Sequence, residues 1–192
     1  METLTHTVLK LIREEREASC TLPFIVAIDG RCASGKSTLA AALSRELVCP
    51  VIHMDDFFLR PDQRTAERLA TPGENIDHER FLSEVLTPLK EGRELFYRPF
   101  DCSTGSLGAP VRVPSSDTVI IEGSYAHHPA LREYYTLRIF LTVAPEEQMR
   151  RIVLRNGPRY AEIFRDKWIP LEESYFKVCR IPEGAHAVFQ NQ

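Results

Sequence analysis

Short apolar runs alternate along the chain with segments in which apolar residues recur every three or four positions. The runs predict buried β-strands at 24–29, 50–54, 118–121, 137–143 and 187–189. The segments with helical spacing predict α-helices at 3–18, 37–47, 78–91, 145–155 and 160–178, the last interrupted at Pro170. Strands that alternate with helices form a parallel sheet with helices on both faces, so an α/β fold is expected.

The remaining segments are rich in turn-forming residues. Residues 60–77 hold two prolines and a glycine among charged side chains and predict an irregular loop. Residues 92–117 carry only short β fragments, near 96–98 and 111–113. A long, weakly structured stretch inside a domain is usually functional, which predicts a substrate-side insertion here. The 192 residues contain no repeat or linker, so one domain with its core at about 20–192 is expected.

Charge and cysteine content narrow the range of partners. The 24 lysines and arginines nearly balance the 27 aspartates and glutamates, and the formal net charge is −3. This balance gives no general attraction to nucleic acid or to an anionic membrane, so neither is expected as a partner. The five cysteines are widely spaced, and residues 1–19 lack the apolar core of a signal peptide. Reduced thiols in the cytoplasm are expected, with Cys32 either an oxidation-sensitive thiol or simply a small loop residue.

Residues 30–37 form the pattern G-x-x-x-x-G-K-S between a predicted strand and a predicted helix. This phosphate-binding P-loop in its strand–loop–helix setting predicts a P-loop NTPase-type sheet. Its glycines allow backbone N–H groups to converge on one anion, and the helix adds its positive end. Lys36 is expected to contact the β- and γ-phosphates of ATP, and the Ser37 hydroxyl to bind Mg²⁺. The residues expected to bind the nucleotide are Gly30, Ala33, Ser34, Gly35, Lys36, Ser37 and Thr38.

Three carboxylates follow predicted strands, at the edge of the sheet where the P-loop also lies. Asp55 and Asp56 close the strand at 50–54, and Glu122 closes the strand at 118–121. Asp55 is expected to hold Mg²⁺ or to accept a proton from an attacking hydroxyl, and Glu122 to orient the Mg²⁺ ion and its water. The alternative is that these carboxylates only cap turns or face solvent.

Arginines are concentrated near a predicted helix break at Gly157-Pro158. Arg151 and Arg155 share one helix face, and a lid over residues 156–170 would bring arginines to the transferring phosphate. The alternative is surface pairing with nearby glutamates. The arginines of this segment are Arg150, Arg151, Arg155, Arg159 and Arg165.

Several other polar and aromatic residues have more ordinary explanations. Asp77 precedes the helix predicted at 78–91 and is expected to cap it. Trp168 and Tyr175 are seven residues apart on a predicted helix, which favours packing in the core. The spacing of three histidines does not match a metal site, so they are expected to cap or to pack: His53, His127 and His128.

Four segments together resemble the uridine kinase and phosphoribulokinase-like family of P-loop kinases, including its nicotinamide riboside kinase branch. The segments are Met54-Asp55-Asp56-Phe57-Phe58, Ile76-Asp77-His78-Glu79-Arg80-Phe81, Ile120-Ile121-Glu122-Gly123 and Met149-Arg150-Arg151-Ile152-Val153-Leu154-Arg155. The resemblance implies that Asp55 is the general base for a 5′-type hydroxyl and that Asp77 binds ribose-like hydroxyls. It also implies that Arg151, Arg155 and Arg159 are lid contacts to phosphate or substrate, with Arg159 on the nucleotide side.

The chain departs from this family where uridine kinases read the base. Their Tyr-Asp-x-x-x-His element corresponds here to residues 100–105, which lack both the tyrosine and the histidine. A site that loses such partners loses discrimination for the base, which disfavours uridine itself. The substrate-binding residues expected are Asp55, Phe58, Asp77, Phe100, Asp101 and Arg151.

The chain is therefore predicted to be an ATP- and Mg²⁺-dependent kinase in which Asp55, Lys36, Arg151 and Arg155 are the catalytic residues. Its expected acceptor is a nucleoside or a ribose-like alcohol. Nicotinamide riboside and pantothenate are alternative acceptors, and a non-catalytic or regulatory nucleotide-binding protein is the alternative class. ATP or GTP preference and oligomeric state stay open.

Overall fold

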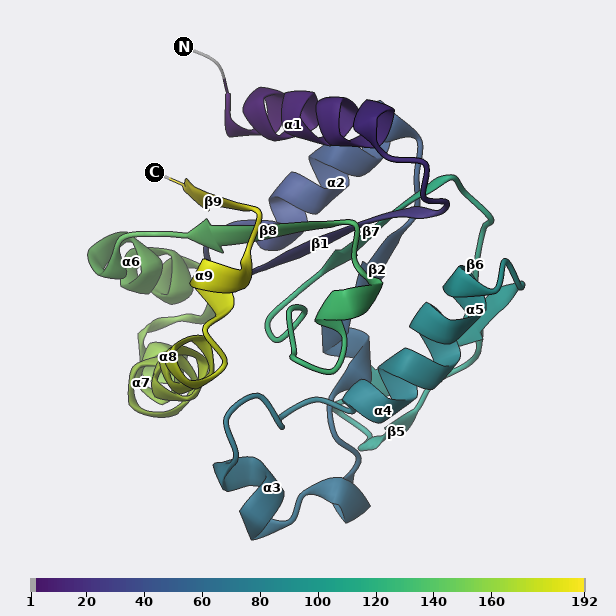
Figure 1. Ribbon diagram of the computed structural model, residues 1–192. Coiled ribbons are helices and arrows are strands. Elements are labelled where there is room, and N and C mark those ends of the chain that lie inside the picture. Colours follow the sequence, from purple (N-terminus) through teal and green to yellow (C-terminus); the bar gives the residue numbers. More distant parts are fainter. Residues whose placement is uncertain (1–2, 192) are drawn as a thin grey trace.

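A computed structural model describes residues 3–191 of the chain as a five-stranded parallel sheet flanked by helices (Figure 1). The strand order is β2-β7-β1-β8-β9, and every neighbouring pair is parallel. The strands are β1 (Phe24–Gly30), β2 (Val51–His53), β7 (Thr118–Glu122), β8 (Leu137–Thr142) and β9 (Ala187–Gln190). The predicted α/β class with a P-loop NTPase-type parallel sheet is confirmed.

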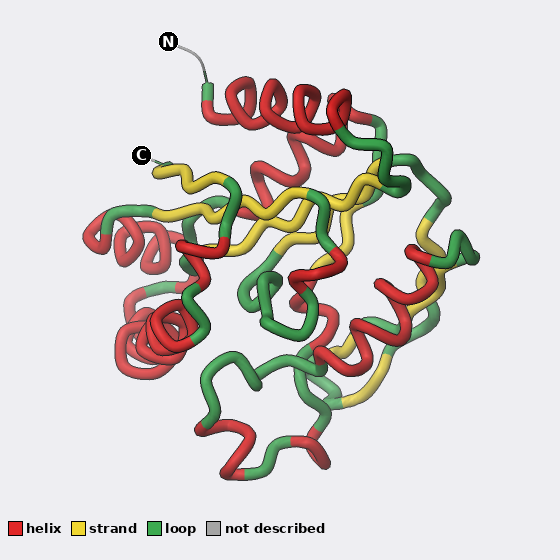
Figure 2. Tube along the Cα trace, viewed as in Figure 1, coloured by secondary structure: helices red, strands yellow, loops and turns green. Residues whose placement is uncertain are grey.

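Alternate residues of β1 face two different hydrophobic cores, as a strand buried on both faces requires. Phe24, Val26 and Ile28 pack with α1 (Leu4–Ala18) and α2 (Lys36–Leu47). Ile25 and Ala27 pack on the opposite face. That second core is formed with parts of α4 (His78–Phe81), α8 (Ile169–Val178) and α9 (Ile181–Gly184). Figure 2 shows the two helical layers with the sheet between them.

Two long helical segments change their hydrogen-bonding period before a proline. A π-helical segment, Leu82–Leu86, joins α4 to α5 (Thr87–Lys90), and a second, Phe164–Trp168, joins α7 (Pro158–Ile163) to α8. Each is followed by a proline at the second residue of the next helix, Pro88 or Pro170. Because proline has no N–H to donate to residue i−4, the preceding turn widens. The interruption predicted at Pro170 therefore lies earlier, over Phe164–Trp168.

The segments between the main elements hold short structures of their own. The insertion contains two small antiparallel pairs, β3 (Leu95–Tyr97) with β6 (Val111–Val113) and β4 (Phe100–Asp101) with β5 (Ser106–Leu107). The loop predicted at 60–77 contains a short helix, α3 (Ala66–Ala70). The strand predicted at 50–54 ends at His53, and a 3₁₀ turn follows over Met54–Phe57. Asp55 and Asp56 thus lie in this turn, and placing them at the end of the strand was wrong.

Two aromatic side chains predicted for the core differ in burial. Tyr175 is fully buried, as expected, whereas Trp168 is 37% exposed and the prediction for it was wrong. The π-helical segment that contains Trp168 changes the angular spacing on which that prediction relied.

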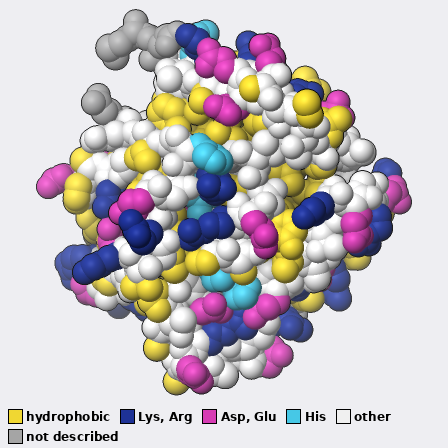
Figure 3. Space-filling view, viewed as in Figure 1, with side chains coloured by type: hydrophobic (Ala, Val, Ile, Leu, Met, Phe, Trp, Pro, Cys, Tyr) yellow, Lys and Arg dark blue, Asp and Glu magenta, His cyan; other side chains and the backbone are white. Residues whose placement is uncertain are grey.

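The surface carries mixed charge. On the face viewed in Figure 3, acidic and basic side chains are interspersed, in line with the small net charge. None of the helices within residues 3–191 is long and apolar enough to cross a membrane.

Candidate active site

The carboxyl ends of three neighbouring strands form the edge of the site. Glu122 of β7 lies beside Ile28 of β1 on one side and beside His53 of β2 on the other. The P-loop follows β1 directly, so the parallel register brings the loop, Glu122 and the turn after β2 together.

The P-loop adopts left-handed backbone conformations at Gly30, Ala33 and Gly35, with φ of 140°, 57° and 95°. A Cβ at Gly30 would overlap the backbone of Leu141 on β8, so packing within the sheet itself requires glycine there. Gly35 is the N-cap of α2, and the Asn191 side chain donates a 2.7 Å hydrogen bond to the neighbouring Ser34 carbonyl.

Lys36 places a cation across the P-loop. Its Nζ donates to the carbonyls of Gly30 at 2.7 Å and Arg31 at 3.0 Å, and it lies 3.5 Å from the Ser124 hydroxyl. Among residues 3–191 it forms no ion pair with a carboxylate, so its charge remains available to an anion in the loop.

Hard oxygen ligands meet beside the P-loop. The Ser37 hydroxyl donates to Oε2 of Glu122 at 3.1 Å, and Glu122 is buried. Hydroxyl and carboxylate oxygens are the ligands that Mg²⁺ prefers, so Ser37 and Glu122 fit this ion. Besides desolvation, Glu122 raises the pKa of Asp55, the third predicted metal ligand, so these two carboxylates interact electrostatically.

Asp55 and Asp56 have different surroundings although they are adjacent. Tyr97 donates a 2.7 Å hydrogen bond to Asp56, which fixes this carboxylate to β3. The Asp55 carboxylate accepts no hydrogen bond from the described part of the chain. Partial desolvation, and then repulsion by Glu122, raise the pKa of Asp55 above its ordinary value, against the opposing charge of Lys36. A raised pKa makes Asp55 a stronger base than a free aspartate.

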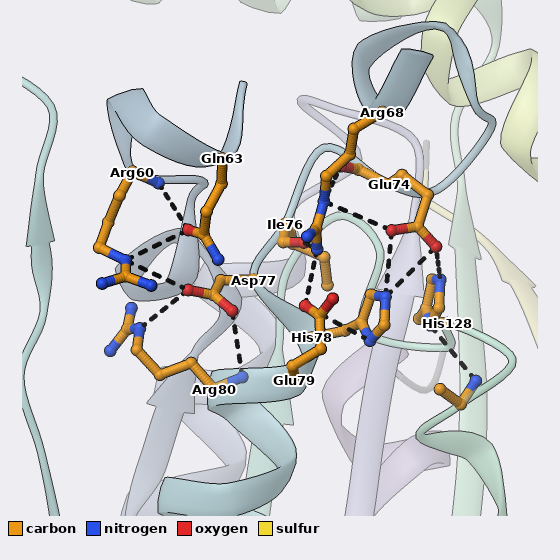
Figure 4. Close-up of polar contacts among 11 residues, drawn as sticks. Arg60, Gln63, Arg68, Glu74, Ile76, Asp77, His78, Glu79, Arg80 and His128 are labelled. Carbon is orange, nitrogen blue, oxygen red and sulfur yellow. Dashed lines mark hydrogen bonds and ion pairs between the residues drawn. The ribbon is translucent and has the colours of Figure 1, made fainter. Parts of the chain in front are cut away.

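Asp77 caps α4, as the sequence predicts, but only with one of its oxygens. Oδ1 accepts from the backbone N–H of Arg80 at 3.1 Å. Oδ2 is buried without a hydrogen bond in residues 3–191, 3.7 Å from Nε of Arg60 and 3.6 Å from Nε of Arg80. Figure 4 shows both guanidinium groups turned toward this carboxylate, and Gln63 holding Arg60. A groove of about 500 Å³ is lined in part by Asp77, Arg60 and Arg80.

Of the five arginines between positions 150 and 165, only Arg151 contacts the P-loop in the described residues. From α6 (Pro145–Asn156), Nη1 of Arg151 donates to the Ala33 carbonyl at 3.3 Å. The Arg155 guanidinium lies 5.9 Å from the ring centre of Phe164. Arg165 pairs with its neighbour Asp166, and Arg159 has no partner within residues 3–191.

Cys32 receives two contacts that the sequence did not predict, one from each side of the predicted lid. The Cys32 N–H donates to Glu172 of α8 at 2.9 Å, and its carbonyl accepts from Gln148 of α6 at 3.0 Å. The other oxygen of Glu172 accepts from Ser124 at 2.6 Å. A buried glutamate on a helix has no signal in the sequence. Burial and the Glu172 charge raise the pKa of the Cys32 thiol to about 12, which disfavours a reactive thiolate.

A second cluster shows how one of the histidines expected to cap or to pack, His128, is packed. The side chains of Glu74, His78 and His128 place potential metal ligands within 4.8 Å of one another, although their spacing in the sequence gives no sign of it (Figure 4). The two imidazoles stack at 4.2 Å, with Nε2 of each facing Glu74 at 3.1 and 3.4 Å. Nδ1 of His128 accepts from the backbone of Ala130, so its Nε2 carries the hydrogen and donates to Glu74. Hydrogen bonds to Glu74 and stacking of the two imidazoles therefore account for this cluster.

Comparison with solved structures supports the assignment of the fold. A possible uridine kinase from Bacillus stearothermophilus aligns with a TM-score of 0.69 at 21% identity, covering 94% of this chain and 95% of that one. A protein from Silicibacter sp. TM1040, named for a fructose transport system kinase, aligns with a TM-score of 0.71 at 24% identity, covering 98% of this chain and 100% of that one. These alignments show that the chain has the fold of P-loop kinases.

Sequence comparison then gives the family. Mouse nicotinamide riboside kinase 2 is 34% identical over 139 residues, which are 68% of this chain and 67% of that protein. Uridine kinase-like protein 4 of Arabidopsis thaliana is 27% identical over 167 residues, which are 81% of this chain. The chain belongs to this family of uridine kinase-like and nicotinamide riboside kinases. It spans about a third of the length of the two Arabidopsis relatives, and no protein-family model matches it.

Proposed function

We propose that the chain transfers the γ-phosphoryl group of ATP to a hydroxyl of a nucleoside or another ribose-like alcohol. The observation that carries the proposal is the meeting of a P-loop lysine, a hydroxyl–carboxylate pair and a carboxylate of raised pKa at one edge of the sheet. These are the parts that phosphoryl transfer needs, since its catalysis is mainly positioning and charge stabilisation.

The residues divide this work between the two substrates. Lys36 and the amides of the P-loop hold the phosphates, while Ser37 and Glu122 hold Mg²⁺, which neutralises phosphate charge when bound. Asp55 accepts the proton of the attacking hydroxyl, and Thr38 belongs to the nucleotide side. Arg151 is the lid arginine closest to this role, because it already contacts the P-loop.

The acceptor is proposed to lie beside Asp77. Oδ2 of this carboxylate faces Arg60 and Arg80 but has no hydrogen bond in residues 3–191, and it would accept one from a ribose-like hydroxyl. Phe58, Phe100 and Asp101 are proposed to complete the acceptor side. The Arg64 guanidinium lies 5.5 Å from the ring centre of Phe100, which leaves less of this ring free to stack on a base and agrees with the case against uridine. Nicotinamide riboside and pantothenate are the alternative acceptors.

A panel of acceptors with ATP and Mg²⁺ tests the proposal. Nucleosides, nicotinamide riboside, pantothenate and sugar alcohols are each supplied, and ADP release is measured. A kinase releases ADP only with the right acceptor. Slow ADP release that no acceptor changes would instead support a regulatory nucleotide-binding protein.

Replacement of the proposed base provides a sharper test once an acceptor is known. Asp55→Asn is expected to lower kcat by a factor of about 10² to 10⁴, because it removes the proton acceptor, with a smaller change in the KM for ATP. Asp56→Asn is the matched control, since its carboxylate is bound to Tyr97. Equal losses of kcat in the two variants would show that Asp55 is not the base.

A further inference from the structure

His53 is the last residue of β2 and has no role in the mechanism given above. The strand register pairs it with Glu122 of β7, so the two side chains lie side by side on one face of the sheet. Its Nδ1 lies 2.6 Å from Oε1 of Glu122. His53 therefore contacts the same carboxylate, Glu122, that accepts a hydrogen bond from Ser37.

The direction of this hydrogen bond follows from the chemistry of its partners. A carboxylate can only accept, so the hydrogen lies on Nδ1 and the imidazole donates. The other oxygen of Glu122 accepts from Ser37 at 3.1 Å. Each oxygen of Glu122 thus has its own partner, and the carboxylate has little freedom to rotate. Glu122 has a side chain that is 5% exposed, whereas that of His53 is 48% exposed, so the donor approaches from the solvent side.

We propose that His53 is a positioning residue that holds Oε1 of Glu122 so that Oε2 stays directed at the Mg²⁺ ligand Ser37. The inference rests on the proposed nucleotide site but not on the identity of the acceptor. Groups that hydrogen-bond a metal ligand fix its orientation, and their loss commonly lowers metal affinity 10- to 100-fold. The oxygen donors of Ser37 and Glu122 fit Mg²⁺, so the same effect is expected here.

A purely structural contact between β2 and β7 would make a different prediction. It would stabilise the fold equally with and without metal, and any loss of nucleotide affinity would be independent of Mg²⁺. Substitution of His53 by asparagine or by glutamine distinguishes the two roles, because these neutral amides place the N–H group at different positions. Asparagine places it close to the position of Nδ1, whereas glutamine places it near Nε2, away from Glu122.

The experiment is calorimetric titration of His53→Asn, His53→Gln and the parent chain with a non-hydrolysable ATP analogue, in Mg²⁺ and in EDTA. His53→Gln is expected to lose about 10- to 100-fold in affinity with Mg²⁺ and to stay within about 2-fold in EDTA. His53→Asn is expected to stay within about 3-fold of the parent in both. Equal losses in the two variants, or a loss in EDTA as large as in Mg²⁺, would overturn the proposal.

The same data separate this inference from the proposed function. If the parent binds the nucleotide in a Mg²⁺-dependent way but phosphorylates no acceptor, the inference can stand while the kinase proposal fails. If the parent gains no affinity from Mg²⁺, the inference is overturned. Should His53→Gln fail to fold, His53→Ala takes its place and is expected to show the same loss of affinity in Mg²⁺ but not in EDTA; an equal loss in EDTA would overturn the proposal.

Discussion

Two buried tyrosines near Asp29 provide a test of how the end of β1 is held in place. Asp29 is fully buried at the end of β1, immediately before the P-loop. Its carboxylate accepts from the N–H groups of Gly30 at 2.6 Å and His127 at 2.8 Å, and from the Tyr175 hydroxyl at 2.8 Å. The Tyr135 hydroxyl is also buried, but it has no hydrogen-bond partner in residues 3–191.

The same substitution should therefore have opposite consequences at the two tyrosines. Tyr175→Phe keeps the ring in place and removes one of three donors to a buried carboxylate. A hydrogen bond to a charged group contributes about 1.5 to 3 kcal/mol, so a loss of about 2 kcal/mol in the free energy of unfolding is expected. Tyr135→Phe removes a buried hydroxyl that lacks a partner, so no loss, or a gain of up to about 1 kcal/mol, is expected.

Urea and thermal unfolding of the parent and both variants measure this difference. For a chain of this length, 2 kcal/mol corresponds to a fall in Tm of about 4 to 8 °C for Tyr175→Phe. Tyr135→Phe should melt at or above the Tm of the parent. If both variants lose the same stability, the carboxylate of Asp29 does not depend on Tyr175, and the account of this cluster is wrong.

Two further predictions concern acid and the first glycine of the P-loop. Burial lowers the pKa of His128 to about 4 and also lowers the pKa of His127, so both are neutral in the folded state. The unfolded chain therefore binds more protons than the folded chain below about pH 6.5. The free energy of unfolding is at its full value above this pH and falls as the pH drops toward 4. For His128 the expected fall is about 1 to 3 kcal/mol. Urea midpoints at pH 7.5 and 5 check this, and an unchanged midpoint would contradict it. Gly30→Ala is expected to prevent folding, because its Cβ would overlap the Leu141 backbone. In Gly92→Ala the new Cβ meets nothing within 4 Å, so only the positive φ should lower the free energy of unfolding, by about 1 kcal/mol. Circular dichroism and soluble yield compare the two variants.

The elements that the sequence predicted well are those whose signal is local. A strand buried on both faces is mostly apolar, which identifies β1 and β7 although Asp29 and Glu122 near their ends are polar and buried. The P-loop needs its glycines and lysine at fixed spacing, and it lies between a strand and a helix as predicted. The α/β class followed from the order of these elements.

The features that the sequence did not reveal depend on contacts between distant segments. Nothing in the residues around Asp55 shows that the chain leaves β2 one residue early and turns as a 3₁₀ helix. The hydrogen bond from His53 to Glu122 exists only because the register of two parallel strands aligns them. Likewise, Glu172 is an ordinary glutamate on a helix until the fold brings it to the backbone of Cys32.

The backbone N–H and carbonyl groups of Cys32 form hydrogen bonds with residues on the two sides of the proposed lid. Gln148 holds the carbonyl from the chain before the lid, and Glu172 holds the N–H from the chain after it. The helical segment between them, from α6 to α8, is thus held at both ends by one residue of the P-loop. The conformational entropy of bringing its ends together is lost during folding rather than during binding. Movement of this segment over a substrate would therefore not require its two ends to be brought together.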